Sequence, residues 1–188
     1  MSRPLNVVAV VGTLRSPSKT TALAELILAT LAAQTETESR IIELHTLGPD
    51  LAGTAEREEL GVKAQEALHA VEAADLVIAA SPVFQGSYSG LFKHFFDFVG
   101  PYALAAKPVV LAATGGSDRH ALVVEHALRP LFAFLQAWTA PAGIYLSAGD
   151  FDGTTILNPE VYERIEMAVA DVVPVAVALA GLRQTVAP

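Results

Sequence analysis

Three short segments of almost uniformly apolar residues constrain the fold of this chain more than any other feature. They are Val7–Val11, Leu76–Ala80 and Pro108–Ala113, and each leads into a loop that contains Ser, Thr, Gly or Pro. A strand with one face in water alternates between apolar and polar residues, so continuous apolar runs indicate strands that are covered on both faces. Such strands belong in a parallel sheet with helices on both sides.

Segments of helical composition and period lie where the crossovers of a parallel sheet are needed. We expect helices at about 19–34, 62–74, 90–99, 121–137 and 159–182. A weaker second strand is expected at 40–44, a fifth strand near 143–146, and a surface loop over 45–60, which contains Gly48, Pro49 and Gly53.

Five strands that alternate with five helices through right-handed crossovers predict an α/β fold. The natural form is a flavodoxin-like three-layer sandwich with a five-stranded parallel sheet in the order 2-1-3-4-5. The sequence has no internal repeat and no linker, so residues 1–188 are expected to be a single domain. Ligands of such a sheet bind at the carboxyl ends of strands one and three. The loops that begin at Gly12, Ser81 and Thr114 leave these ends and should share one crevice.

Composition and charge exclude several classes of function. A net charge of −8 argues against nonspecific binding to nucleic acid, and the absence of cysteine excludes disulfides and thiolate catalysis. No HExxH pair and no acidic cluster with ligand spacing is present, so no metal is expected. Charge or proline interrupts the longest apolar stretches, and no secretory signal precedes the first strand, so we expect a cytoplasmic protein without a membrane partner. With 52% hydrophobic and 17% charged residues, exposed apolar surface and a homo-oligomer, a dimer or tetramer, are expected.

The loop Gly12–Thr21, which we call the phosphate loop, has the composition of an anion site. The first turn of the helix that follows has backbone N–H groups without intrahelical partners and the positive end of the helix dipole. Arg15 adds a guanidinium suited to phosphate, and hydroxyls come from Ser16, Ser18, Thr20 and Thr21. A single glycine excludes a Walker loop and a dinucleotide fingerprint. Simple N-capping is the alternative interpretation, because Ser and Thr precede many helices.

Two further loops supply features suited to a flat ring. In the platform loop, Ser81–Gly90, Pro82 fixes the backbone, Gly86 permits close approach and Phe84 offers an apolar surface. In the glycine loop, Thr114–Ser117, two consecutive glycines permit the same approach. Each loop alone could be an ordinary turn. Together, a monophosphate site and a ring platform at one crevice describe a site for flavin mononucleotide (FMN).

The motifs of these loops also resemble a known family over about residues 3–175. They are Gly12-Thr13-x-Arg15-x-x-Ser18, Ser81-Pro82-Val83-Phe84 with Ser87, Gly90, Lys93 and Asp97, and Thr114-Gly115-Gly116. This pattern is similar to the NAD(P)H-dependent FMN reductases, and within them to the reductases of two-component alkanesulfonate (methanesulfonate) monooxygenase systems. One departure is Lys19-Thr20-Thr21, where many relatives have Asn after the serine. The residues expected to contact FMN are Thr13, Arg15, Ser16, Ser18, Thr20, Thr21, Pro82, Val83, Phe84, Gln85, Gly86, Ser87, Thr114, Gly115, Gly116 and Ser117.

The resemblance implies that NAD(P)H reduces FMN by hydride transfer from nicotinamide C4 to flavin N5, and that a separate FMNH2-dependent monooxygenase receives the product. Stacked rings and backbone amides suffice for this reaction, so no catalytic side chain is expected. Two alternatives remain open: a quinone or azo reductase that retains FMN, and a flavodoxin-like electron carrier without nicotinamide chemistry. The sequence does not distinguish NADH from NADPH.

The segment expected to form the helix 121–137 contains a conflict. Pro130 lacks an N–H, and its ring would clash with the carbonyl of His126 in a regular α-helix. A kink or a π-helical turn would resolve this, and we expect a widened turn at 124–130. The alkanesulfonate reductases that the chain resembles commonly have a π-helical insertion at a subunit interface here, with His126 at the matching position.

Overall fold

A computed structural model describes residues 3–186 of the chain, with side chains through residue 182. A central parallel sheet is built from β1 (Leu5–Val11), β2 (Thr37–Glu43), β3 (Leu76–Phe84) and β5 (Pro108–Gly115), and ends in β6 (Trp138–Thr139) and β7 (Ile144–Ser147). Their order is β2-β1-β3-β5, followed by β6 and β7, which both pair with β5. The flavodoxin-like order of the crossover strands is therefore the predicted one, with the fifth strand divided in two.

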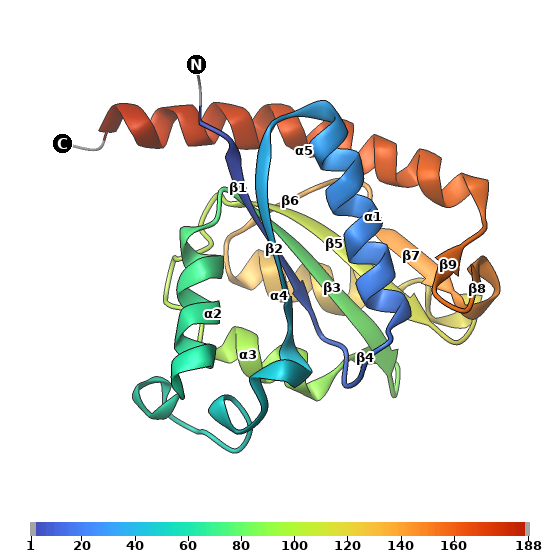
Figure 1. Cartoon of the computed structure of the whole chain (residues 1–188), viewed down its shortest axis with the longest axis horizontal. Coiled ribbons are helices and arrows are strands. Elements are labelled where there is room, and N and C mark those ends of the chain that lie inside the picture. The colour runs from blue at the N-terminus through green and yellow to red at the C-terminus, as the bar shows by residue number, and fades with distance from the viewer. Residues whose placement is uncertain (1–2, 187–188) are drawn as a thin grey trace.

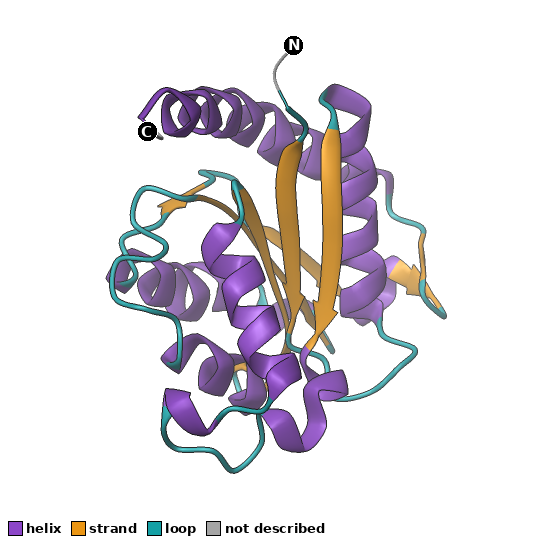
Figure 2. Cartoon of the chain, turned by 60° about the vertical axis from the view of Figure 1, so that its left-hand side comes forward, coloured by secondary structure: helices purple, strands orange, loops and turns teal. Residues whose placement is uncertain are grey.

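Helices cover both faces of this sheet, as Figures 1 and 2 show. α1 (Lys19–Gln34) and α5 (Pro159–Val186) lie on one face. The other face carries α2 (Val62–Ala73), α3 (Gly90–Asp97), a π-helix at Val124–Leu128 and α4 (Arg129–Phe134). A separate small hairpin joins β8 (Phe151–Asp152) to β9 (Thr155–Ile156), and β4 (Ser87–Tyr88) pairs antiparallel with the end of β3.

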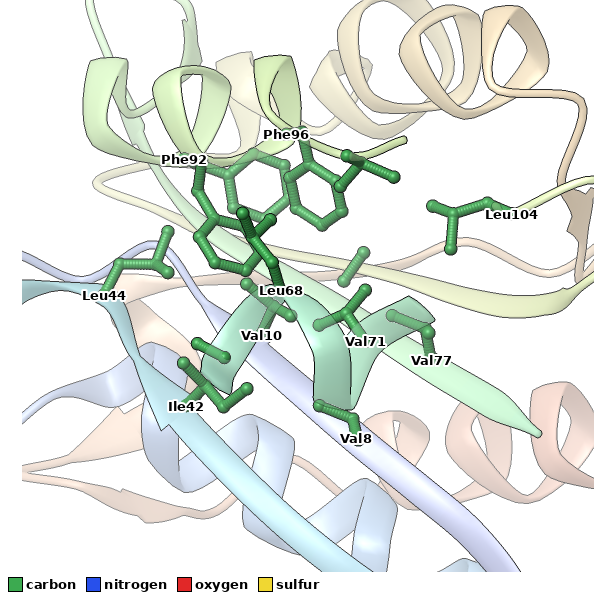
Figure 3. Close-up of a cluster of buried hydrophobic side chains, with 14 of the residues drawn as sticks. Val8, Val10, Ile42, Leu44, Leu68, Val71, Val77, Phe92, Phe96 and Leu104 are labelled. Carbon is green, nitrogen blue, oxygen red and sulfur yellow. The ribbon is translucent and has the colours of Figure 1, made fainter. Parts of the chain in front are cut away.

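The continuous apolar strands are buried on both faces because two hydrophobic cores meet at the sheet. Alternate residues of β1 point to opposite sides, so that Val8 and Val10 belong to one core and Val7 and Val11 to the other. Figure 3 shows the first core, in which Phe92 and Phe96 of α3 lie above the sheet together with residues of α2. This packing fixes the start of α3 beside the end of β1.

Several details differ from the sequence prediction. The sheet has seven strands rather than the predicted five. The sequence analysis missed β4 and β6 because strands of two residues carry no recognisable pattern. Residues 45–60 are not a simple surface loop: they include 3-10 turns at Leu44–Asp50 and Arg57–Glu59, and Leu47, Leu51 and Leu60 are buried. These leucines complete the core beneath α2 and α3.

One helix of the described residues is long and apolar enough to cross a membrane by length and composition. The segment Pro159–Leu182 reaches a mean hydropathy of 1.9, and 33% of that window is buried. Glu166, Asp171 and Pro174 interrupt this segment, as the sequence analysis states, but the helix still has this length and mean hydropathy. The buried side of the helix packs against the second core.

Candidate FMN site

Three loops meet at the carboxyl ends of β1, β3 and β5. The Gly12 N–H donates to Ala80 O at 2.8 Å, which joins the start of the phosphate loop to β3. The hydroxyls of Thr20 and Thr114 lie 2.6 Å apart and join the first turn of α1 to the glycine loop. The convergence predicted from the sequence is thus present, and side chains connect the loops directly.

The phosphate loop presents backbone donors that have no acceptor within residues 3–186. Ser18 is the N-cap of α1, and its hydroxyl accepts from Thr20 N at 3.2 Å and Thr21 N at 3.3 Å. The N–H groups of Thr13, Ser16 and Ser18 itself have no such partner. Capping therefore occurs as the alternative interpretation requires, but it leaves other donors of the loop available. Unpaired N–H groups at a helix N-terminus are the donor set that a phosphate needs.

Three of the predicted hydroxyl ligands are turned toward protein partners. Thr13 Oγ1 donates to Arg15 O at 2.9 Å, and Thr21 Oγ1 donates to Glu43 Oε1 at 2.5 Å. Thr20 is buried against Thr114, as described above. Ser16 and the side chain of Arg15 are exposed. The groups left for an anion are therefore Arg15, the hydroxyls of Ser16 and Ser18, and the backbone N–H groups.

Ser89, which the sequence analysis did not select, links the phosphate loop to the platform loop. Its hydroxyl donates to Gly12 O at 2.7 Å and accepts from Phe92 N at 3.2 Å. Its own N–H donates to Ser81 Oγ at 3.0 Å. Its position directly before the helical run that starts at Gly90 is a recognisable N-cap signal. Nothing in the sequence pattern indicated that the same hydroxyl also contacts the phosphate loop at Gly12.

The platform loop is a β-hairpin with a two-residue turn. Val83 pairs with Tyr88 and Phe84 with Ser87, which leaves Gln85 and Gly86 at the turn with φ of 49° and 81°. A positive φ at both positions is the geometry that glycine and few other residues adopt readily. A Cβ at Gly86 would have no neighbour within 4 Å. The Phe84 side chain is 46% exposed at this end of the hairpin, whereas Pro82, Val83 and Ser87 are half-buried.

The two glycines of the glycine loop have different surroundings. A Cβ at Gly115 would lie 2.2 Å from the hydroxyl oxygen of Tyr145, whereas a Cβ at Gly116 would have no neighbour within 4 Å. The Tyr145 hydroxyl donates to Ser117 O at 2.6 Å. Burial, together with Asp118 and Asp150, raises the pKa of Tyr145, so it remains a neutral donor. Gly115 therefore admits Tyr145, and Gly116 is the position open to a ligand.

A widened turn is present at the predicted place. The Arg129 N–H bonds to Val124 O, five residues earlier, and Val124–Leu128 forms a π-helix. Pro130 is the second residue of α4, and both Pro130 and His126 are exposed. They line a groove of about 910 Å³ between α3 and α4, which also includes Tyr102 and Phe134. Both aromatic side chains are largely exposed, at 73% and 84%.

No group of three or more His, Asp and Glu side chains is placed to hold a metal ion in the part of the chain that the structure describes. Lys19 belongs to the phosphate loop, and its Nζ lies 3.4 Å from Ala148 O and 5.1 Å from the centre of the Phe151 ring. Lys19 and Arg15 are thus two basic residues of the phosphate loop.

An open parallel sheet with an anion loop and a ring platform at its carboxyl edge is the architecture of a flavin-nucleotide oxidoreductase. The family model described as NADPH-dependent FMN reductase matches residues 5–152, and the chain belongs to this family. It is accordingly an oxidoreductase that uses FMN together with NADH or NADPH.

Similar proteins of known name agree with this family assignment. The chain is 46% identical to the NADH-dependent FMN reductase SfnF of Pseudomonas fluorescens over 93% of both chains, and 44% identical to the FMN reductase (NADPH) of Pseudomonas aeruginosa over 93% of this chain and 94% of that one. Among solved structures, an oxidoreductase from Corynebacterium diphtheriae is 34% identical with a TM-score of 0.81 and covers 94% of this chain and 99% of its own. A flavodoxin from an archaeon, 12% identical with a TM-score of 0.58, covers 90% of this chain and 97% of its own and shares the fold.

Proposed function

We propose that this protein uses NAD(P)H to reduce FMN as a dissociable substrate and supplies the reduced FMN to a separate flavin-dependent monooxygenase in the cytoplasm. The motif resemblance to reductases of alkanesulfonate monooxygenase systems supports this role. The names of two relatives, NADH-dependent FMN reductases SfnF and SfnE, agree with FMN as the species reduced. The observation that carries the proposal is the phosphate loop, whose unpaired N–H groups lie beside an open ring platform.

The phosphate of FMN would be held by the backbone N–H groups of Thr13, Ser16 and Ser18, with the Ser16 hydroxyl and Arg15 as further donors. Thr20, Thr21 and Thr114 would support the loop rather than contact the anion, because their hydroxyls already have protein partners. This assignment is narrower than the sequence analysis suggested. The loop has only one glycine, unlike the glycine-rich loops that bind dinucleotides or nucleoside triphosphates, and this favours a monophosphate as its ligand.

The flavin ring would lie between the platform loop and the glycine loop. Gly86 and Gly116 leave space for close approach, and Phe84 offers an exposed apolar surface. When bound, FMN accepts a hydride at N5 from the nicotinamide. The residues of the chain would align the two rings, while the N–H groups near Gly86 and Gly116 stabilise negative charge at one ring edge. None of these roles needs a side chain that gains or loses a proton.

Exchange of FMN is favoured over retention by the aromatic content of the platform. Flavodoxin-like carriers enclose the ring between aromatic side chains, which requires two of them. Here Tyr88 packs against Phe92, with ring centres 5.8 Å apart, and so belongs to the core side of the hairpin. Phe84 is then the one aromatic side chain of the platform loop left to contact the ring.

A homo-oligomer formed through the π-helix region completes the proposal. The groove beside His126 and Pro130 is flanked by the exposed rings of Tyr102 and Phe134, and Leu122 is 61% exposed nearby in sequence. Exposed aromatic groups of this size gain free energy when a partner covers them. The interface role of His126 and Pro130, taken from the family resemblance, belongs to this proposal.

Oxidation of NADH and NADPH by the purified protein, with and without added FMN, tests the reaction. We expect oxidation of at least one nucleotide when FMN is supplied. A lack of oxidation with either nucleotide would favour the electron carrier. Oxidation that passes to quinones or azo compounds without any need for added flavin would favour the FMN-retaining enzymes.

A further inference from the structure

We propose that Ser89 is a positioning residue for the FMN phosphate. Its hydroxyl fixes the orientation of the Gly12–Thr13 peptide, so that the Thr13 N–H faces the phosphate. This inference rests on the proposed function, because it assigns a role within the phosphate site. It concerns a residue of the platform loop that would act on the phosphate loop through a backbone contact.

Ser89 is held in place from three directions. The side chain is 1% exposed, and its hydroxyl both donates to Gly12 O and accepts from Phe92 N, the latter in the first turn of α3. The backbone N–H of Ser89 donates to Ser81 Oγ, and that hydroxyl donates to Pro82 O at 2.9 Å. The hydroxyl therefore has a fixed direction, set by α3 and by the end of β3.

The contact with Gly12 determines where the next N–H points. The peptide between Gly12 and Thr13 is trans, and in a planar trans peptide the C=O and the N–H point in opposite directions. Because Ser89 holds Gly12 O on the inner side, the Thr13 N–H is directed to the outer side of the loop. Thr13 is 4% exposed, and within residues 3–186 this N–H has no acceptor. A buried donor of this kind is costly unless a ligand or solvent accepts its hydrogen bond.

Close packing prevents the peptide from turning over. A Cβ at Gly12 would lie 2.9 Å from Ser89 Oγ and 2.9 Å from Phe92 Cβ, so the backbone of the phosphate loop touches the start of α3 directly. Phe92 is fully buried in the first core, where it lies beside Phe96 on α3 (Figure 3). The donor geometry of the phosphate loop is thus set before the ligand arrives, which lowers the ordering cost of binding.

The test compares the dissociation constants of FMN and riboflavin, measured by quenching of flavin fluorescence. Riboflavin lacks the phosphate, so the ratio of the two constants isolates the phosphate contribution. We expect Ser89→Ala and Ser89→Gly each to reduce the FMN preference by about ten-fold, the equivalent of one hydrogen bond to a charged group. Riboflavin binding and kcat at saturating FMN should stay as in the wild type, and Ser89→Thr, which keeps the hydroxyl, should restore the preference.

Two controls separate positioning from folding. Glycine is a good N-cap, so Ser89→Gly retains the start of α3 while it removes the donor to Gly12. Asp50→Ala removes a comparable first-turn contact far from the site, the bond from Lys63 N to Asp50 Oδ2 at 2.9 Å. It should lower the Tm and leave the FMN preference unchanged. An unchanged preference in both Ser89→Ala and Ser89→Gly would overturn the inference, whereas a wild-type protein without FMN preference would overturn the phosphate site itself.

Discussion

Two neighbouring glycines, Gly115 and Gly116, show that one sequence feature can have two causes. The sequence analysis assigned both to close approach by a planar ring. In the structure, Gly115 is required by Tyr145, whose hydroxyl occupies the space of a Cβ, and Gly116 alone faces open space. A Gly-Gly pair identifies the loop, but the neighbour that makes Gly115 necessary, Tyr145, comes from a strand thirty residues later along the chain, which local sequence cannot reveal.

The two glycines should therefore respond differently to substitution. Gly115→Ala forces Tyr145 to move, and we expect a loss of about 1–3 kcal/mol in the free energy of unfolding, measured by urea denaturation. Gly116→Ala should leave that free energy unchanged and weaken FMN binding, because the new methyl group projects into the space proposed for the ring. Equal stability losses in both variants would contradict this assignment.

Substitutions of Ser16 and Ser18 distinguish a role in anion binding from a role in helix capping. Ser18 caps α1 through Thr20 N and Thr21 N, whereas Ser16 is exposed. Ser16→Ala should raise the dissociation constant of FMN without a change in Tm. Ser18→Ala should raise the dissociation constant of FMN and also lower the Tm, since loss of a cap costs about 1 kcal/mol. If neither change alters the affinity for FMN, the loop does not bind the phosphate and serves only to cap α1.

At the scale of elements, the π-helix was predictable because its cause is local. Pro130 cannot donate to His126 O, and the chain forms a π-helical turn at Val124–Leu128 just before it. The support for this turn was not predictable, because it comes from a distant segment. Arg129 donates to Thr139 Oγ1 at 2.8 Å and to Ala140 O at 3.1 Å, and it also pairs with Glu125.

Arg129→Met should therefore destabilise the region. We expect a loss of about 1–3 kcal/mol in the free energy of unfolding, because Thr139 Oγ1 and two backbone carbonyls lose their donor. Glu125→Gln is the matched control: it removes the charge pair but leaves Arg129 its other partners, so its effect should be smaller. Urea denaturation of both variants provides the comparison, and a larger loss in Glu125→Gln would show that the ion pair dominates.

At the scale of the whole molecule, the parallel sheet and its strand order followed from the apolar runs and the alternation with helices. The bounds of α1 agree with the prediction at both ends, because Ser18 and the polar segment after Gln34 are strong local signals. The division of the fifth strand into β6 and β7, the β4 pairing and the buried leucines of 44–60 depend on tertiary contacts. The location of the site was predictable from topology, whereas the hydrogen bonds that join its loops were not.

The assembly of the molecule can be tested at the groove beside the π-helix. Phe134→Glu places a charge on the proposed interface, and sedimentation should show a smaller assembly than the wild type. Met167→Glu is a matched change on α5, where the side chain is also exposed. It should leave the mass of the assembly unchanged. Identical masses for the wild type and Phe134→Glu would contradict the proposed interface.

Acid stability should depend on the ion pair between Arg57 and Glu72. Burial raises the pKa of Glu72, but the Arg57 guanidinium and the Gly100 N–H lower it more, so the net pKa lies below the ordinary value. The unfolded chain then binds the proton more readily, and this stabilisation is present at neutral pH and lost as the pH falls through the folded-state pKa. Urea midpoints of the wild type should therefore decline more steeply below about pH 4 than those of Glu72→Gln. Parallel declines would contradict this role.

The most direct test of the account is the dependence of NAD(P)H oxidation on added FMN, measured with protein from which small molecules have been removed by gel filtration. The account predicts a colourless protein whose rate rises from zero with FMN concentration and saturates, because FMN enters and leaves as a substrate. A yellow protein whose rate is independent of added FMN would contradict it.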